Sequence, residues 1–376
     1  MSTTVNLDTW IDQTLHLRKN KNLFRELKIY SGLTDFCSND YLGLGRSEKL
    51  FNLIQERTAS INLKMNGATG SRLLSGNSKF TEAVEHKLAS IFKSASTLIF
   101  NSGYTANLAI FSSIPQKGDT ILFDELAHAS IKDGTRLSLA KRFSFRHNDL
   151  HDLESKIKRA SGKIFIAVES IYSMDGDECP LREITALANQ YKALIILDEA
   201  HSTGIEGSEG SGRATSLGLE NDIPIRLYTF GKAMGIHGAC VAGSEKLVQY
   251  LINFARPFIY TTAMTPHSMV SIDCAFDYLK ENIHLQSELA QNIKLFLTHV
   301  ERTDNRIPSQ SAIQTIIFPG NDNVKQKALA LQEKGFDIRP ILSPTVPVGS
   351  ERMRICLHAF NTTEEIVKLT GELNKL

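Results

Sequence analysis

The amino-acid sequence predicts an α/β fold, with a mostly parallel seven-stranded sheet and a smaller α+β domain towards the C-terminus. From about residue 97, short runs of β-branched and aromatic residues alternate with polar turns and stretches of helical periodicity. The runs are so apolar that both faces of each strand are expected to be buried. Polar residues gather at the C-terminal ends of the runs, where parallel sheets place their binding sites.

Seven runs are predicted to form the sheet. In chain order they are STLIFNS (96–102), DTILFD (119–124), RFSFRHND (142–149), KIFIAVES (163–170), ALIILDE (193–199), IRLYTFGK (225–232) and ACVAGS (239–244). Helix-length segments separate most of them, which is typical of a parallel sheet with helices on both faces.

The flanking segments are predicted from the same periodicities. Before the sheet we expect a helix over roughly 7–27, a short extended piece and a helix over 46–64. After residue 275 we expect a long helix, a strand over 314–319, a helix over 324–335, a strand over 352–359 and a terminal helix over 362–376. The predicted parts are an N-terminal segment (1–45), a large domain (46–275) and a small domain (276–376).

Composition narrows the class of protein. A chain of 376 residues with 42% hydrophobic residues, 22% charged residues and a net charge of +1 is typical of a globular protein and does not favour nucleic acid as a partner. The first residues lack the apolar stretch of a leader, and no apolar run approaches the ~20 residues of a membrane span, so we expect a cytoplasmic protein without membrane contact. The 5 cysteines are scattered and include no Cys-x-x-Cys pair, which indicates neither a disulfide framework nor a zinc site.

The tetrapeptide Asp-Glu-Ala-His at 198–201 is also found in a group of ATP-driven helicases. Such a motor needs a phosphate loop that ends in Gly-Lys-Ser or Gly-Lys-Thr. Neither Gly162-Lys163 nor Gly231-Lys232 is followed by Ser or Thr, and both lack the glycine that begins such a loop. A metal site built from the same Asp, Glu and His is a competing interpretation, although we expect no metal. The tetrapeptide therefore indicates a chemistry other than that of an ATP-driven helicase.

Lys232 has surroundings that an ordinary surface lysine lacks. It directly follows a predicted strand and lies among Gly231, Gly235 and Gly238, which permit tight turns and the close approach of a flat ligand. Asp198 ends another strand of the same sheet, so one pocket can receive both side chains. Pyridoxal 5′-phosphate (PLP) needs this pair: lysine forms a Schiff base with its aldehyde, and a carboxylate keeps its pyridine nitrogen protonated.

Seven motifs extend this interpretation to most of the chain. They are SNDYLGL (38–44), GSRLLSGN (70–77), NSGYTAN (101–107), ESIYSMDGD (169–177), LDEAHSTG (197–204), TFGKAMGIHGA (229–239) and PTVPVGSERMRI (344–355). Together they resemble the α-oxoamine synthases, PLP enzymes that join an amino acid to an acyl thioester with loss of CO₂. The resemblance runs from about residue 20 to the C-terminus. It implies PLP-dependent transferase fold type I, the fold of aspartate aminotransferase.

The resemblance assigns a role to each residue around the cofactor ring. Lys232 is similar to the lysine that binds the cofactor and later removes the Cα proton. Asp198 matches the carboxylate on the pyridine nitrogen, and His201 the imidazole on the phenolic oxygen, with the residues between them as spacers. His128 matches the histidine that stacks on the ring, and Ser173 matches a further residue of the cofactor pocket.

The resemblance also implies how the phosphate is held. Gly103 and Tyr104 match a glycine-aromatic pair at the start of a helix, where free backbone N–H groups favour anions. Thr229 matches a hydroxyl that reaches the same phosphate. Thr262 matches a threonine supplied by the neighbouring subunit, which implies a homodimer with shared active sites. Thr265 departs from the family pattern, which has proline there.

Four residues match positions that contact substrate. Arg354 is similar to the arginine that holds the amino-acid carboxylate, which suits the planar fork of a guanidinium. Thr345, Asn39 and Arg25 are similar to other substrate-contacting residues. The segment between Arg25 and Asn39 is shorter than in many relatives. DEAHSTG, YSMDGD and TVPVG most resemble members that condense L-alanine with a pimeloyl thioester.

Three alternatives stay open at this point. Another member of the family would share the lysine and use other substrates. A PLP-binding regulator would carry a DNA-binding module ahead of this fold, and we expect the segment before the resemblance to be too short for one. The thioester carrier is either coenzyme A or an acyl carrier protein as a transient partner.

Overall fold

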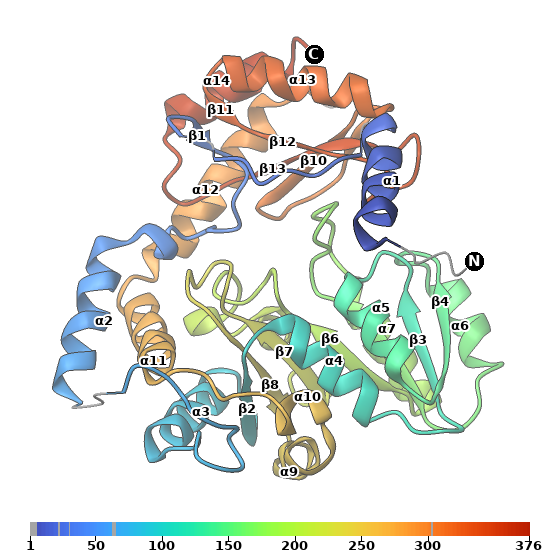
Figure 1. The fold of residues 1–376 in the computed structure, drawn as a ribbon, viewed down its shortest axis with the longest axis vertical. Helices are drawn as coiled ribbons and strands as arrows, with labels where there is room; N and C mark the ends of the chain where they lie inside the picture. The colour runs from blue at the N-terminus through green and yellow to red at the C-terminus, as the bar shows by residue number, and fades with distance from the viewer. Residues whose placement is uncertain (1–5, 22, 30, 62–64, 302–303) are drawn as a thin grey trace.

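The central sheet has the seven strands that the sequence predicts. The computed structural model describes residues 6–21, 23–29, 31–61, 65–301 and 304–376. Its large sheet has the order β2-β8-β7-β6-β5-β3-β4, and β8 runs antiparallel to both of its neighbours while the other adjacent pairs are parallel (Figure 1). The strands are β2 (Ser96–Phe100), β3 (Thr120–Asp124), β4 (Lys141–Phe145), β5 (Ile164–Glu169), β6 (Leu194–Asp198), β7 (Ile225–Thr229) and β8 (Ala239–Gly243).

Helices cover both faces of this sheet because side chains alternate along each buried strand. In β6, Ile196 packs into one core cluster, whereas Ile195 and Leu197 pack into the cluster on the other face. One face is covered by α4 (Gly103–Ser113), α5 (Ala129–Leu137), α9 (Glu245–Phe254) and α10 (Arg256–Ile259). The other is covered by α6 (Leu150–Ile157), α7 (Leu181–Tyr191), α3 (Lys79–Ile91) and α11 (Pro266–Glu281).

The C-terminal part has its own small sheet of order β12-β13-β10-β9. Its strands are β9 (Arg306–Ile307), β10 (Ile313–Ile317), β12 (Arg339–Ile341) and β13 (Arg352–Cys356). The helices α12 (His284–His299), α13 (Asn321–Glu333) and α14 (Thr363–Leu373) lie around it. A parallel pair, β1 (Thr34–Asp35) with β11 (Phe336–Asp337), ties the N-terminal segment to this part. The fold class is confirmed.

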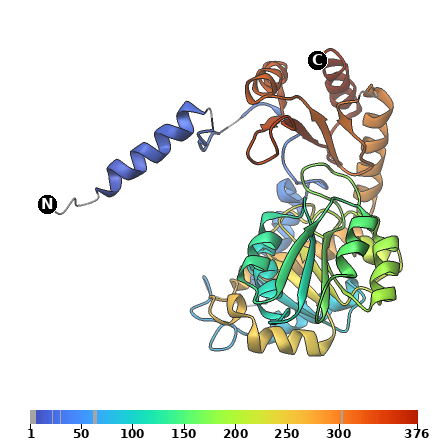
Figure 2. The ribbon, with the colours of Figure 1, turned by 90° about the vertical axis from the view of Figure 1, so that its right-hand side faces the viewer.

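Several predicted helix bounds are wrong. The first helix, α1, spans Leu7–Asn20 and not 7–27; it buries no side chain and projects from the rest of the chain (Figure 2). The helix α2 spans Glu48–Ser60, and the end of the predicted range, 62–64, lies outside the described residues. The one long helix expected after residue 275 is the pair α11 and α12, and α11 begins at Pro266. The predicted boundary at 275/276 falls inside α11, and the domain bounds stay a prediction.

Six strands end at one edge of the large sheet, and five of them lead into loops that carry predicted site residues. β2, β3, β5, β6 and β7 run in the same direction, so their carboxyl ends meet there. Gly103, His128, Ser173, His201 and Lys232 each follow one of these ends within a few residues. The topology therefore gathers most of the predicted site in one place.

Among the described residues, no helix is long and apolar enough to cross a lipid bilayer.

Candidate active site

A cavity of about 240 Å³ lies at this edge of the sheet. Eight of the predicted residues line it: Asn39, Gly103, Tyr104, His128, Asp198, His201, Thr229 and Lys232. Asn107, Ser130, Glu169 and His237 line it as well, although the sequence analysis assigned them no role. The cavity thus combines an amine, two carboxylates and three imidazoles, the kinds of group that general acid–base chemistry uses.

Asp198 presents a buried carboxylate to the cavity. Only 6% of the residue is exposed, and its two oxygens accept hydrogen bonds from Asn107 Nδ2 (2.8 Å) and the backbone N–H of Ala200 (2.9 Å). Among the described residues it forms no ion pair within 4.0 Å. A buried carboxylate of this kind favours a cation, and its remaining lone pairs can accept one more proton donor. The protonated nitrogen of a pyridine ring fits this requirement.

Lys232 lines the same cavity, and Glu169 lies opposite Asp198 in the register of β5 and β6. Burial lowers the pKa of Lys232, which makes its neutral amine more available. Burial, together with the charge of Asp198, raises the pKa of Glu169 to about 8. One Glu169 oxygen accepts the backbone N–H of His128 at 2.5 Å. Glu169 therefore fixes the loop that carries His128.

His201 is almost fully buried in the cavity wall. Its Nδ1 lies 2.8 Å from the hydroxyl of Tyr41, and burial lowers the pKa of the imidazole well below its usual range. The Glu199 side chain between Asp198 and His201 points elsewhere and accepts the backbone N–H groups of Arg213 (3.0 Å) and Ala214 (2.8 Å). Glu199 thus anchors a neighbouring turn and is more than a spacer.

The start of α4 forms the opposite end of the cavity. Ser102 caps the helix by accepting the N–H of Thr105 at 3.2 Å, and Gly103 and Tyr104 follow with backbone N–H groups of the first turn. A Cβ on Gly103 would lie 2.5 Å from Thr229 Cγ2, so only glycine lets the helix start approach β7 this closely. A phosphate fits this helix end, and Thr229 adds a hydroxyl beside it.

Arg354 connects the cavity to the neighbouring loops. Its Nη2 donates to Asn39 Oδ1 (2.9 Å) and to the Tyr41 hydroxyl (3.2 Å), and its Nε donates to the carbonyl of Ser173 (2.6 Å). The Ser173 side chain lines a second cavity of about 300 Å³, which His128 and Thr345 also line. Arg354 therefore contacts one lining residue of each cavity, Asn39 and Ser173, but lines neither cavity itself.

Arg25 and Thr345 come together away from Lys232. Arg25 Nη2 donates to Thr345 Oγ1 at 3.3 Å, and both residues line a third cavity of about 210 Å³. The structure therefore pairs two predicted substrate residues from opposite ends of the chain. It does not place Arg25 in the cavity that contains Lys232.

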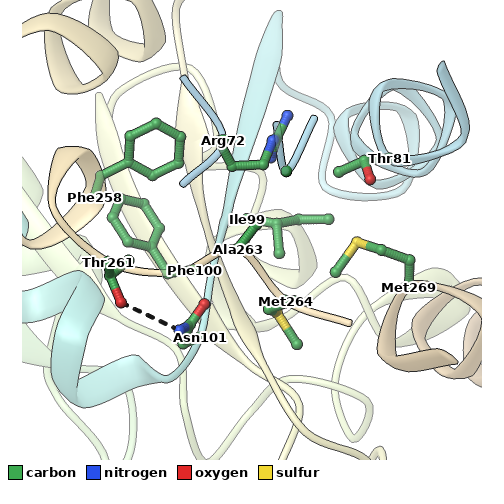
Figure 3. A pocket seen from close by; sticks show the side chains of 11 residues that line it. Arg72, Thr81, Ile99, Phe100, Asn101, Phe258, Thr261, Ala263, Met264 and Met269 are labelled. Atoms are coloured by element: carbon green, nitrogen blue, oxygen red, sulfur yellow. Dashed lines mark hydrogen bonds between the residues drawn. The ribbon is translucent and has the colours of Figure 1, made fainter. Parts of the chain in front are cut away.

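Thr262 does not line the cavity of its own chain. The loop that bears it is held by Asn101 Nδ2, which donates to the Thr262 carbonyl at 3.1 Å and approaches Thr261 Oγ1 at 3.5 Å (Figure 3). The Thr262 side chain is exposed. Thr265, which stands where the family has proline, caps α11 by accepting the N–H of Ser268 at 3.1 Å.

Three residues of the site escaped the sequence analysis. Asn107 is 1% exposed and holds both Asp198 and Ser130, while Glu169 holds the His128 loop. Tyr41 lies within hydrogen-bonding distance of both His201 and Arg354. All three stand inside quoted motifs, Asn107 in NSGYTAN, Tyr41 in SNDYLGL and Glu169 in ESIYSMDGD, and this is the one signal that the sequence offers. Only the folded chain shows what their side chains contact.

His147, which follows β4, bridges two carboxylates. Its Nδ1 lies 2.9 Å from Asp124 Oδ1, and its Nε2 lies 2.6 Å from Asp177 Oδ2. Burial alone would lower the pKa of His147, but the hydrogen bonds to Asp124 and Asp177 raise it to about 9. Asp124 ends β3, and Asp177 belongs to the loop that carries Ser173. His147 therefore fastens two loops of the site to each other.

Comparison with known proteins identifies the family. Residues 31–373 match the family of class I and II aminotransferases. An 8-amino-7-oxononanoate synthase from Emericella nidulans is 39% identical over 94% of this chain and 92% of its own length. A putative 8-amino-7-oxononanoate synthase from Bacillus licheniformis is 37% identical over 97% of this chain and 96% of its own.

Solved structures agree with this family. An 8-amino-7-oxononanoate synthase from Francisella tularensis superimposes with a TM-score of 0.77 at 28% identity and covers 92% of this chain and 98% of its own. Serine palmitoyltransferase from S. paucimobilis, solved with bound PLP, gives 0.87 at 23% identity over 98% of both chains, and this likeness shows the fold alone. The chain therefore belongs to the class I and II aminotransferase family, within which its relatives include the 8-amino-7-oxononanoate synthases.

Proposed function

We propose that the protein is an 8-amino-7-oxononanoate synthase of biotin biosynthesis. In this reaction L-alanine condenses with a pimeloyl thioester to give 8-amino-7-oxononanoate, CO₂ and the free thiol carrier. The observation that carries the proposal is the pairing of Lys232 with the buried carboxylate of Asp198 in one cavity. Relatives of that name, at 37–39% identity over nearly the whole chain, support the choice of substrates.

The proposed cofactor is PLP, and the residues of the cavity fit it. Lys232 would hold it covalently, Asp198 would accept the proton of its ring nitrogen, and His201 would face its phenolic oxygen. Gly103 and Tyr104 would hold its phosphate through their backbone N–H groups. When bound, PLP withdraws electrons from the Cα of the amino acid and so stabilises negative charge there.

The side chains of this chain would then divide the remaining work. Arg354 would attract the carboxylate of alanine with its positive charge and with the one Nη1 hydrogen that its bonds to described residues leave open. Lys232 would take the Cα proton, which the lowered pKa of its amine favours. The new C–C bond forms at the thioester carbonyl as the C–S bond breaks, and the original carboxylate leaves as CO₂. His128 would pack on the ring face and orient that carboxylate.

The second cavity would receive the acyl chain. It adjoins His128 and is lined in part by Leu126, Met174, Val346 and Pro347, which suits a run of methylene groups. Within this proposal the acyl group can be carried either by coenzyme A or by an acyl carrier protein. The cytoplasmic location also belongs to the proposal.

We further propose a homodimer with shared active sites. Thr262 is exposed outside the cavity of its own chain, as expected of a residue that serves a partner. Leu73, Leu74 and Tyr260 are exposed, with Leu74 at 86%, and Arg72 and Thr261, which precede Leu73 and follow Tyr260 in the sequence, line the pocket in Figure 3. Clustered exposed apolar side chains favour a protein interface.

One assay tests the proposed function. The purified protein is incubated with PLP, L-alanine and pimeloyl thioesters on coenzyme A or on acyl carrier protein, and the products are identified by mass. We expect the amino ketone and CO₂ from at least one carrier. The rival function is that of another α-oxoamine synthase, such as 2-amino-3-ketobutyrate CoA ligase or 5-aminolevulinate synthase. Product from glycine and a different acyl-CoA, with none from alanine, would favour that rival.

A further inference from the structure

Tyr41 places one buried hydroxyl between the two functional ends of the site. The residue is 1% exposed, and its hydroxyl lies 2.8 Å from His201 Nδ1, 3.2 Å from Arg354 Nη2 and 3.0 Å from Asn39 Oδ1. His201 is the residue proposed to face the cofactor, and Arg354 the residue proposed to bind the amino-acid carboxylate. One phenol thus contacts a group from each side.

The Tyr41 backbone is fixed, which makes these contacts specific. Its N–H donates to the Asn39 carbonyl at 2.8 Å, and its carbonyl accepts the N–H of Ala359 at 2.8 Å. Its ring packs parallel to His358, with centroids 6.5 Å apart. The N-terminal segment is therefore held against the small domain while the hydroxyl reaches into the large domain.

Counting donors shows where the phenolic proton can go. A guanidinium only donates, so Arg354 Nη2 supplies one hydrogen to Asn39 Oδ1 and one to the Tyr41 oxygen. The Tyr41 hydroxyl can then donate its proton to one of two acceptors. Asn39 Oδ1, at 3.0 Å, already accepts from Arg354, whereas His201 Nδ1 is closer, at 2.8 Å. Burial raises the pKa of Tyr41 above its ordinary value, so the phenol keeps this proton. Burial also lowers the pKa of His201, so the imidazole is neutral and carries one proton.

We infer that Tyr41 is a positioning residue that donates to His201 Nδ1, holds the His201 proton on Nε2 towards the cavity, and fixes Arg354 through the same oxygen. In this tautomer His201 is a hydrogen-bond donor to an anionic oxygen in the cavity. The opposite tautomer would present a lone pair there and would repel the same oxygen. The assignment of that oxygen to PLP rests on the proposed function, whereas the tautomer itself does not.

Nitrogen NMR of protein labelled with ¹⁵N in histidine tests the inference directly. The full chain is measured with PLP and without it, and the His201 signals are assigned by their loss in His201→Asn. We expect an unprotonated Nδ1 and a protonated Nε2 in both forms. A proton on Nδ1 would overturn the inference, even if the protein condenses alanine as proposed. Because the wild-type protein is measured, the result does not depend on whether a Tyr41 variant folds.

Tyr41→Phe supplies a second, independent test. Loss of a hydrogen bond that involves a charged partner is expected to raise both the Kd for PLP and the KM for L-alanine about tenfold or more, and to lower kcat. Tyr228→Phe is the matched control, because the fully buried Tyr228 hydroxyl accepts from Arg226 at 2.8 Å but faces the core. The control should leave all three constants unchanged. Unchanged Kd and KM in a folded Tyr41→Phe protein would contradict the inference.

Discussion

At the scale of single residues, the environment of a side chain decides its chemistry. Lys163 and Lys232 both follow a glycine, yet Lys163 is exposed and Lys232 lines the cavity beside Asp198. Burial lowers the pKa of Lys232 and prepares its amine as a nucleophile and base. The two lysines therefore form a natural pair for comparison.

Lys232→Ala is expected to lose turnover by about 10²–10⁴-fold, because it removes the general base as well as the covalent link to the cofactor. Borohydride reduction of the PLP-loaded protein, followed by peptide mass mapping, should place the cofactor on Lys232. Lys163→Ala should behave like the wild type. Cofactor found on another lysine of the wild-type protein would refute the assignment.

Arg354→Lys should weaken alanine binding although the charge is kept. An ammonium cannot reproduce the several directed N–H contacts of a guanidinium, so it would lose the bonds to Asn39, Tyr41 and Ser173 that hold Arg354 in place. We expect the KM for alanine to rise about 10- to 100-fold. Steady-state kinetics with each substrate varied in turn checks this. If the KM for the pimeloyl thioester rose by a similar factor while the KM for alanine did not change, Arg354 would have a different role.

His147 should stabilise the protein in a pH-dependent manner. Its pKa is raised from 6.5 to about 9 on folding, so its contribution is complete below pH 6.5 and is lost as the pH rises through about 9. Relative to His147→Gln, the wild type should gain about 1 to 2 kcal/mol of unfolding free energy at the low end of that window, once solvent screening is allowed for. Urea unfolding between pH 6 and 9.5 measures the difference. A difference that grows with pH would have the wrong sign.

The residues that the sequence could predict to lie together are those that stand in a motif at the end of a strand. Asp198, His201 and Lys232 belong to this group, and all three line one cavity. Glu169 and Tyr41 act through contacts with residues distant in sequence, which nothing in their immediate neighbourhood reveals. The pairing of Arg25 with Thr345 depends in the same way on the folded chain.

At the scale of elements, the close approach of α4 to β7 shapes the end of the cavity where we propose that the phosphate binds. Gly103 permits this approach, since a Cβ there would meet the Thr229 methyl at 2.5 Å. Gly103→Ala should therefore weaken PLP binding about tenfold, in line with a typical overpacking cost of about 1–3 kcal/mol. Adding Thr229→Ser removes the methyl and keeps the hydroxyl, so the double variant should recover much of the loss. PLP titration followed by absorbance measures both, and a double variant no better than Gly103→Ala would exclude this steric explanation.

Secondary-structure elements could be predicted from the sequence where most of their side chains are buried. Strands such as β5 and β6 are apolar on both faces, and this pattern predicts most strands of the large sheet. The edge strand β4 differs, because four of its five residues are exposed. The first helix ends at Asn20 and not at 27, and none of its residues is buried against the described part of the chain. The two-residue strands β1, β9 and β11 carry no pattern long enough to recognise.

At the scale of the whole molecule, the proposed dimer can be tested by mixing two inactive proteins. Lys232→Ala retains Thr262, and Thr262→Ala retains Lys232. If Thr262 serves the partner's site, a hybrid dimer contains one intact site, so an equal mixture should restore about a quarter of all sites. Activity is measured after the chains are unfolded and refolded together. A mixture no more active than the mean of its components would show that the sites are not shared.

The central claim is that this site condenses L-alanine with a pimeloyl thioester, and amino-acid selectivity tests it most directly. The decisive measurement is kcat/KM for alanine, glycine and serine with the same pimeloyl thioester. Glycine lacks a methyl group to bury, worth about 0.8 kcal/mol, and larger side chains should overfill the space beside Lys232 at a cost of about 1–3 kcal/mol. We therefore predict that alanine has the highest kcat/KM. A higher value for glycine or serine would contradict the claim and favour a sister α-oxoamine synthase.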